Sequence, residues 1–163
     1  MTLVLCPGIH DPQLTQAFWQ AIQKTASNNL REAKVHTVND AKSWAFSAMH
    51  VLQFLRQTVL RSEPLIFVCF SAGVVGGIGA AWAWQQQGGA VRAFLAIDGW
   101  GVPLLGSFPI YRLSHDRFTH LTSQPLGMGQ HPFYADPGVG HLDFWRSRTE
   151  LGVAGIEMGR NCG

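Results

Sequence analysis

The sequence has few charged residues, and the charges it has are nearly balanced. Only 13% of its 163 residues are charged, and the net charge is +2. Proteins that bind nucleic acid usually carry a clustered excess of Lys and Arg, which neutralises phosphates. We therefore expect no nucleic-acid partner.

Cysteine is also scarce, with three residues at Cys6, Cys69 and Cys162. An odd number without regular spacing argues against a disulfide framework. Cys6 and Cys69 end apolar segments and are expected to be small buried fillers. The histidines do not show the spacing of metal ligands either. This holds for His10, His115, His120 and His131. We expect neither a metal nor another cofactor.

Long apolar runs are missing as well. The most apolar stretch, Ala72 to Trp84, is short and rich in glycine, so it is not expected to span a membrane. Thr2 to Cys6 resembles a strand followed by a proline-glycine turn, not a signal peptide. With 47% hydrophobic residues, the chain can form its own core as one domain over residues 1–163. We expect a cytoplasmic protein with no membrane partner, and the sequence does not indicate its oligomeric state.

The apolar segments predict an α/β fold. Buried strands are expected at residues 3–6, 35–38, 65–69 and 93–97, with further strands at 108–113 and 133–135. Three of the first four are continuous apolar runs, which are typical of parallel strands covered on both faces. Helical patterns alternate with them, so we expect about six parallel strands joined by right-handed crossovers.

Three of the expected helices have recognisable boundaries or patterns. Asp11 and Pro12 are suited to begin the first helix. A second apolar stripe runs from Trp44 to Val59, and a third helix is expected from just after Ser71 to about Gln87. The third helix carries four glycines in its first turns, which indicates a backbone pressed close to the sheet: Gly73, Gly76, Gly77 and Gly79.

The segment Cys69-Phe70-Ser71-Ala72-Gly73 lies between an apolar strand and this glycine-rich helix. A nucleophilic serine is presented by such a tight strand-to-helix turn, in which small neighbours leave the hydroxyl exposed. Cys69 replaces the first glycine of the usual G-x-S-x-G pattern. The alternative is that Ser71 only caps the helix.

Two glycine-containing loops carry the other candidate residues. Pro7-Gly8-Ile9-His10-Asp11 follows the first strand, and backbone N–H groups of Ile9 or His10, with that of Ala72, are candidates to stabilise an oxyanion. Gly138-Val139-Gly140-His141-Leu142 places His141 after a late strand, as a base for Ser71. The alternatives are an ordinary turn and a surface histidine.

From Leu3 to about Trp145, the order of these motifs resembles the α/β-hydrolase superfamily. The resemblance implies a three-layer fold and a triad in the chain order serine, acid, histidine, with Ser71 and His141 in the outer positions. It also implies a trimmed member that starts at the family's third strand and has no large lid.

The acid of the implied triad has two candidates. Asp116 follows the strand after which the family most often places this residue, and Asp98 follows the preceding strand. We favour Asp116, with Asp98 as the alternative. Either carboxylate could instead be structural, Asp98 in the Gly99–Gly101 turn and Asp116 as a helix cap.

The resulting prediction is a serine hydrolase that acts on an ester or thioester of a small acyl compound. Apolar residues after Asp98 are candidates for the acyl pocket, in particular Trp100, Leu104 and Leu105. Two alternatives stay open. One is a catalytically inert binding or regulatory module of the same fold, and the other is an acyltransferase that uses the same triad.

Overall fold

The computed structural model describes residues 1–25, 28–38, 44–130, 132–146 and 155–157. These residues form a seven-stranded sheet in the order β2-β1-β3-β4-β5-β6-β7. Its strands are β1 (Thr2–Cys6), β2 (Lys34–Thr37), β3 (Leu65–Phe70), β4 (Val91–Ile97), β5 (Ile110–Ser114), β6 (Phe133–Ala135) and β7 (Gly155–Glu157). The first six pair in parallel, and β7 pairs antiparallel with β6. The predicted parallel α/β sheet is confirmed for these six strands, and β7 is an addition.

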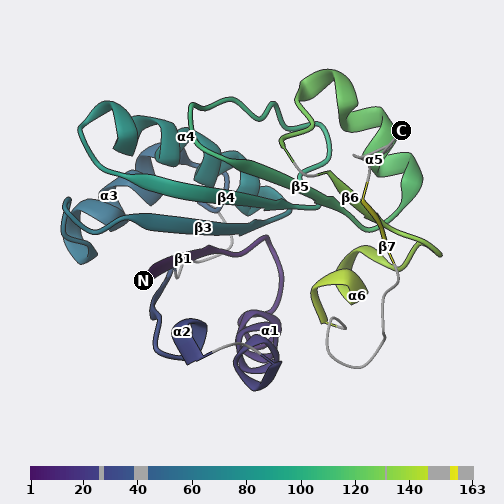
Figure 1. Ribbon diagram of the computed structural model, residues 1–163, viewed down its shortest axis with the longest axis horizontal. Coiled ribbons are helices and arrows are strands. Elements are labelled where there is room, and N and C mark those ends of the chain that lie inside the picture. Colours follow the sequence, from purple (N-terminus) through teal and green to yellow (C-terminus); the bar gives the residue numbers. More distant parts are fainter. Residues whose placement is uncertain (26–27, 39–43, 131, 147–154, 158–163) are drawn as a thin grey trace, which may run out of the picture.

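Helices cover both faces of this sheet, which gives three layers (Figure 1). The helices are α1 (Pro12–Thr25), α2 (Asn28–Arg31), α3 (Ala48–Thr58), α4 (Ala72–Gln86), α5 (Arg117–Ser123) and α6 (His141–Arg146), with a 3-10 turn at Gln124–Leu126. α3 and α4 pack together over one face, and α1 and α6 pack together over the other.

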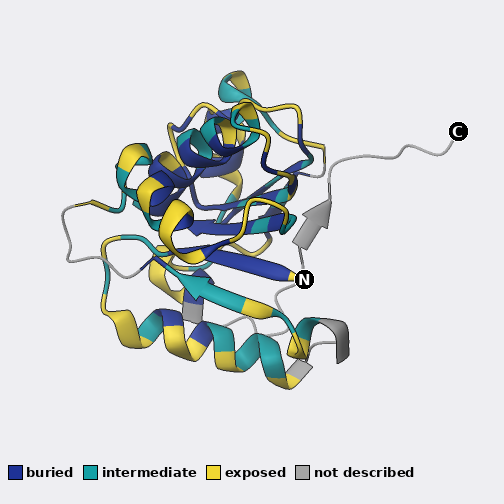
Figure 2. Cartoon of the chain, turned by 90° about the vertical axis from the view of Figure 1, so that its left-hand side faces the viewer, coloured by how far each residue is buried: buried dark blue, intermediate teal, exposed yellow. Residues whose placement is uncertain are grey.

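Two hydrophobic clusters fill the spaces between the layers. The larger one joins the sheet to α3 and α4 and includes Leu55, Phe67 and Trp84. The smaller one joins the opposite face to α1 and α6 through Phe18, Phe70 and Trp145. Figure 2 shows the central strands buried and the outer faces of the helices exposed.

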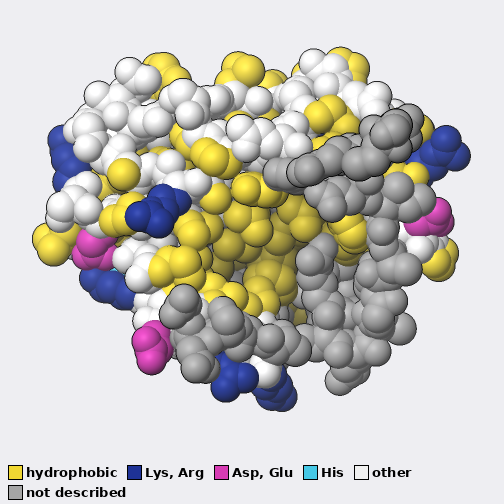
Figure 3. All heavy atoms as spheres, viewed as in Figure 1, with side chains coloured by type: hydrophobic (Ala, Val, Ile, Leu, Met, Phe, Trp, Pro, Cys, Tyr) yellow, Lys and Arg dark blue, Asp and Glu magenta, His cyan; other side chains and the backbone are white. Residues whose placement is uncertain are grey.

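The face that carries the smaller cluster is only partly covered by the described residues. Apolar side chains of three strands are half-buried there, namely Val35, Leu113 and Phe133. Figure 3 shows hydrophobic side chains gathered in the middle of this view, between α1 and α6.

Two of the differences from the expected boundaries have a clear physical cause. β5 starts at Ile110 and not at Phe108, because Pro109 has no N–H to donate to a strand ladder. α3 starts at Ala48, where the Ser47 hydroxyl accepts a hydrogen bond from the N–H of His50. Trp44 therefore lies before the helix and is exposed.

The glycines of α4 allow close packing on two sides. A Cβ at Gly73 would lie 2.1 Å from the Cys6 carbonyl oxygen, and one at Gly77 would lie 2.4 Å from Sγ of Cys69. Gly76 and Gly79 instead face Ala45 and Ala48. The predicted contact with the sheet therefore holds for Gly73 and Gly77, while the other two glycines admit the segment that enters α3.

Cys69 stands where the G-x-S-x-G pattern has its first glycine, and Gly77 provides the space for its side chain. We expect Gly77→Ala to destabilise the protein, because an overpacking cost of about 1–3 kcal/mol exceeds the helix-propensity gain of about 1 kcal/mol. Urea denaturation measures the change. Adding Cys69→Ala should recover stability, and Gln86→Ala on the exposed side of α4 should be near neutral. Equal losses in the single and double variants would contradict this account.

Candidate functional site

Ser71 occupies a strained turn between β3 and α4. Its backbone has φ 51° and ψ −122°, and its N–H donates to the carbonyl of Ile97 at 2.9 Å. Positive φ is costly for a residue with a Cβ and is common at functional sites. Ser71 occupies the N-cap position, but its side chain makes no capping hydrogen bond. The predicted strained turn is confirmed, and the hydroxyl is not used as a cap.

The loop after β1 passes directly beside Ser71. A Cβ at Gly8 would lie 2.9 Å from Cβ of Ser71 and 3.1 Å from the carbonyl oxygen of Phe70. The N–H of His10 donates to the Gly8 carbonyl at 3.1 Å, so this donor is already engaged. Ala72 begins α4, where an N–H has no partner within the helix. Of the two loop candidates for an oxyanion donor, the geometry therefore favours Ile9 over His10.

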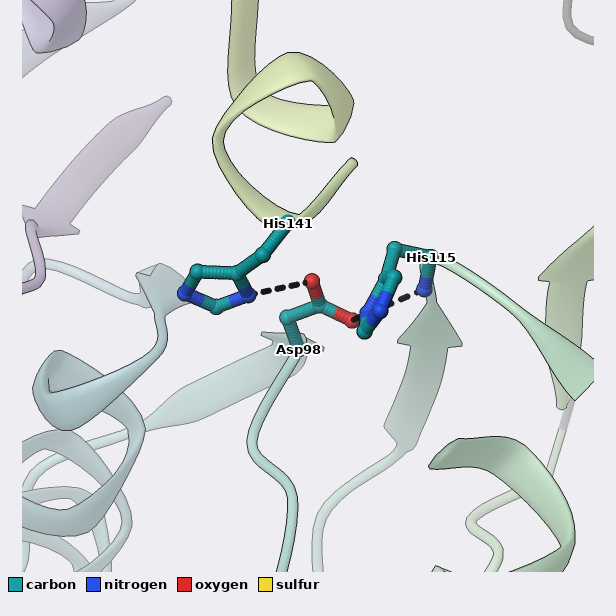
Figure 4. Close-up of side chains that lie close together, drawn as sticks. All are labelled: Asp98, His115 and His141. Atoms are coloured by element: carbon teal, nitrogen blue, oxygen red, sulfur yellow. Dashed lines mark hydrogen bonds and ion pairs between the residues drawn. The ribbon is translucent and has the colours of Figure 1, made fainter. Parts of the chain in front are cut away.

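Asp98 follows β4 and lies at the centre of the site. Its side chain is 1% exposed, and its backbone also has positive φ, at 56°. Oδ2 accepts from Nδ1 of His141 at 2.7 Å, and Oδ1 accepts from Nδ1 of His115 at 2.9 Å (Figure 4). The backbone N–H of His115 also donates to Oδ1, at 2.8 Å. Three donors thus satisfy a carboxylate that water cannot reach.

Asp116, the favoured acid in the sequence analysis, does not contact His141. It is the N-cap of α5, where Oδ1 accepts from the N–H of Thr119 at 2.7 Å. Asp98 lies at the histidine instead, because its carboxylate is bonded to Nδ1 of His141, whereas the Asp116 carboxylate is turned toward the first turn of α5. The preference for Asp116 is corrected to Asp98, which was the alternative.

His141 begins α6 and is held from two sides. The N–H of Val139 donates to the carbonyl of His115 at 3.0 Å, which fastens the preceding loop to the end of β5. The His141 ring stacks on Phe70, the residue before Ser71, with 4.9 Å between ring centroids. Because an ionised carboxylate only accepts, Nδ1 of His141 carries the proton and Nε2 presents a lone pair away from Asp98.

Ser71 and His141 line one cavity of about 340 Å³. Among the described residues no hydrogen bond joins the Ser71 hydroxyl to His141. Asp98, His115 and Thr119 also line the cavity. Its apolar wall is formed by Val75, Trp100 and Val102. The stacked Phe70 places the two groups in the same region of the site.

The three residues predicted for the pocket have different environments. Trp100 lines the cavity, and its indole N–H donates to the hydroxyl of Thr122 at 3.0 Å. Leu104 is 5% exposed and belongs to the core, whereas Leu105 is 71% exposed and does not line the cavity. The assignment is corrected for the two leucines, because the loop turns Leu104 inward and Leu105 outward.

Arg112 organises this loop and was not identified from the sequence. It is 1% exposed and donates to the carbonyls of Gly127, Gly99 and Val102 at 2.7, 3.0 and 2.8 Å. Burial lowers the pKa of Arg112 to about 10. The one feature of the sequence that points to this role is the presence of a charged residue within a short apolar strand. The three bonds brace the segment that presents Trp100 and Val102 to the cavity.

His10 borders the site through its ring. Nε2 lies 3.0 Å from the hydroxyl of Thr15, and Nδ1 is buried with no hydrogen-bond partner among the described residues. Burial lowers the pKa of His10, and the nearby His141 lowers it further. His10 therefore favours its neutral form next to His141.

One group in the described part of the chain has the composition of a metal site, namely Asp98, His115 and His141. Each can offer one ligand atom, and these atoms lie within 4.8 Å of one another. The group was not expected from the sequence, in which His115 shows no metal-ligand spacing; the three residues meet only through space.

No protein-family model matches the chain, and no curated protein matches it either. No helix in the described ranges combines the length and apolar character needed to cross a membrane.

The cap role of Asp116 leads to a stability prediction. Partial burial alone would raise the pKa of Asp116, but the hydrogen bonds from Thr119 and the nearby His115 outweigh it, so the pKa is lowered. The ionised Asp116 cap therefore contributes fully to folding stability above the ordinary carboxyl pKa. This contribution is lost as the pH falls through the lower pKa of Asp116 in the folded protein. We expect Asp116→Ala to cost about 1 kcal/mol at neutral pH.

Denaturation at neutral and acidic pH measures this cost, which should shrink in acid as the carboxylate becomes protonated. Asp116→Asn, which keeps a capping oxygen, is the matched control and should lose less at neutral pH. A pH-independent loss for Asp116→Ala would contradict the assignment.

Proposed function

We propose that the protein is a serine hydrolase with Ser71 as nucleophile, His141 as general base and Asp98 as the acid. One observation carries the proposal: a histidine hydrogen-bonded to a buried carboxylate shares a cavity with a serine held in a strained strand-to-helix turn. In the residue order Ser71, Asp98, His141, this arrangement agrees with the resemblance to α/β-hydrolases.

The residues support an acyl-transfer sequence. Ser71 Oγ attacks the carbonyl carbon of the substrate while its proton passes to the Nε2 lone pair of His141. Asp98 holds the other nitrogen as a donor at 2.7 Å and stabilises the imidazolium that forms. The proton then goes to the leaving group, and water attacks the acyl-enzyme with His141 again as base. Reactive hydrogen bonds often tighten only when substrate is bound, so the missing Ser71–His141 bond is compatible with this role.

The surroundings of Ser71 favour a small apolar acyl group. The N–H of Ala72 at the start of α4 and that of Ile9 are the proposed oxyanion donors. Val75, Trp100 and Val102 supply an apolar wall in a cavity of about 340 Å³. An ester or thioester with a short acyl chain is therefore the proposed substrate class.

Two other functions use the same geometry. An inert binding module would keep the fold without reactivity at Ser71. An acyltransferase would give the acyl group to an alcohol or thiol in place of water, and product analysis with and without such an acceptor distinguishes it from a hydrolase.

We expect the purified chain to react with a fluorophosphonate probe at Ser71 and to hydrolyse a short-chain aryl ester. Ser71→Ala should lose both activities and keep its thermal stability, because the hydroxyl makes no cap hydrogen bond. Intact-mass measurement and an ester assay test this. Ser62→Ala replaces an exposed serine outside the site, and this control variant should still react. An unreactive wild-type protein would favour the inert module, and a reactive Ser71→Ala variant would exclude Ser71 as nucleophile.

The roles of the two carboxylates can be separated by matched substitutions. Asp98→Asn should lower kcat by about 10⁴-fold, because an amide cannot hold His141 in the required tautomer. Asp116→Asn should change kcat far less, since its carboxylate caps α5. Steady-state kinetics of the two folded variants decide the assignment. A crippled Asp116→Asn beside a mildly affected Asp98→Asn would reverse it.

A further inference from the structure

We propose that Asp98, His115 and His141 bind a divalent first-row transition metal ion of the Zn²⁺ class, and that this ion blocks the serine chemistry. The second half of the proposal rests on the proposed function. The first half concerns a cluster of ligand atoms that a serine hydrolase triad does not require, because His115 is additional to it.

The donor set has the chemistry of a transition-metal site. Two imidazoles and one carboxylate are ligands that Zn²⁺ binds at about 2.0–2.2 Å. Such distances place neighbouring ligand atoms roughly 3.3 Å apart around a tetrahedral ion. Here Nδ1 of His141 and Nδ1 of His115 lie 2.7 and 2.9 Å from the two oxygens of Asp98. All three groups are within 4.8 Å of one another, so small side-chain adjustments admit an ion.

His115 also has a second carboxylate in the place that metal-binding histidines favour. Its Nε2 lies 3.7 Å from Oδ2 of Asp116. In the neutral ring that donates from Nδ1 to Asp98, Nε2 is an acceptor and faces this carboxylate without a proton. When Nδ1 binds an ion, the proton moves to Nε2, where the negative charge of Asp116 at 3.7 Å stabilises it. Carboxylate–histidine–metal arrangements of this kind orient the ring and strengthen its binding.

The cluster is open to a small ion and to one further ligand. The side chains of His115 and His141 are 21% and 42% exposed and border the cavity, while the Asp98 carboxylate is covered. The backbone N–H of His115 can continue to donate to Oδ1 of Asp98 when the ion is bound. Water in the cavity would complete four-coordination around the three protein ligands.

The same atoms explain why the ion and the base exclude each other. Metal binding takes the Nδ1 lone pair of His141, so the neutral ring must carry its proton on Nε2. Such a ring cannot accept the Ser71 proton, and Asp98 no longer supports an imidazolium. No redox change or co-reactant is involved. The bonds from the ion to its three ligands replace the hydrogen bonds from the two Nδ1 atoms to Asp98.

The binding half is tested with Co²⁺, which absorbs visible light much more strongly when it is four-coordinate than when it is hydrated in solution. The full chain is treated with a chelator, dialysed and titrated with Co²⁺, and Zn²⁺ is then added as a competitor. We expect a saturable visible band with one ion per chain that Zn²⁺ abolishes. An absent band, or a band that Zn²⁺ does not displace, would overturn the site.

Matched variants locate the ion. His115→Asn keeps an N–H near Asp98 but is a poor ligand, and it should weaken Co²⁺ binding by at least 10-fold. Asp116→Asn should weaken binding by about 10- to 100-fold, as loss of an outer carboxylate does. His50→Asn, on α3, should leave binding unchanged. Each variant is first checked by thermal denaturation. Unchanged affinity in both His115→Asn and Asp116→Asn would overturn the assignment.

The exclusion half is tested by fluorophosphonate labelling of Ser71 during the same Zn²⁺ titration. Labelling should fall in proportion to metal occupancy and return after a chelator is added. Labelling that persists at full occupancy, or hydrolysis that increases with the ion, would overturn the exclusion. If Co²⁺ binds but the metal-free protein never labels, the metal site stands and the proposed hydrolase fails. If labelling occurs without any Co²⁺ binding, the proposed hydrolase stands and the metal site fails.

Discussion

The buried carboxylate of Asp98 is the constraint on which the site depends. An ionised carboxylate removed from water is costly unless hydrogen bonds replace its hydration. The backbone and ring of His115 and the ring of His141 supply those bonds. His115 follows β5 and His141 begins α6, whereas Asp98 follows β4. The hydrogen bonds that compensate the buried charge therefore hold three separate segments together. The Val139–His115 backbone bond reinforces the same junction.

The parallel sheet explains why these loops meet. Ser71, Asp98 and His115 directly follow β3, β4 and β5, and the carboxyl ends of parallel strands share one edge of a sheet. The strand order reverses between β1 and β3, where ligand crevices form in open α/β sheets. Gly8 follows β1 at this point and lies against Ser71. Because Gly8 has no side chain, the loop after β1 can lie directly against Ser71.

Two kinds of chemistry are compatible with the cluster that surrounds Asp98. Protons on the two Nδ1 atoms give a hydrogen-bonded network in which the free nitrogen of His141 can act as a base. An ion in place of those protons gives a metal centre in which that nitrogen is protonated. The position of Asp116 near His115 bears on the choice, because a carboxylate favours a proton on the nitrogen that it faces. Asp116, the cap of α5, therefore influences which nitrogen of His115 carries the proton. That choice distinguishes the hydrogen-bonded form of the cluster from the metal-bound form.

The sequence by itself determined the alternation of strands and helices, the strained turn at Ser71 and the glycine-flanked loop of His141, because each depends on residues close together in the chain. Only the tertiary structure decided which aspartate supports His141. Asp98 and Asp116 both follow strands, and their local sequences do not encode which end lies nearer to α6. The roles of Arg112 and His115, and the inward turn of Leu104, depend likewise on loops that meet through space. Hydrophobic periodicity indicates which face of a helix or strand is buried. It does not indicate which polar groups far apart in the chain will contact one another, and the site consists of such contacts.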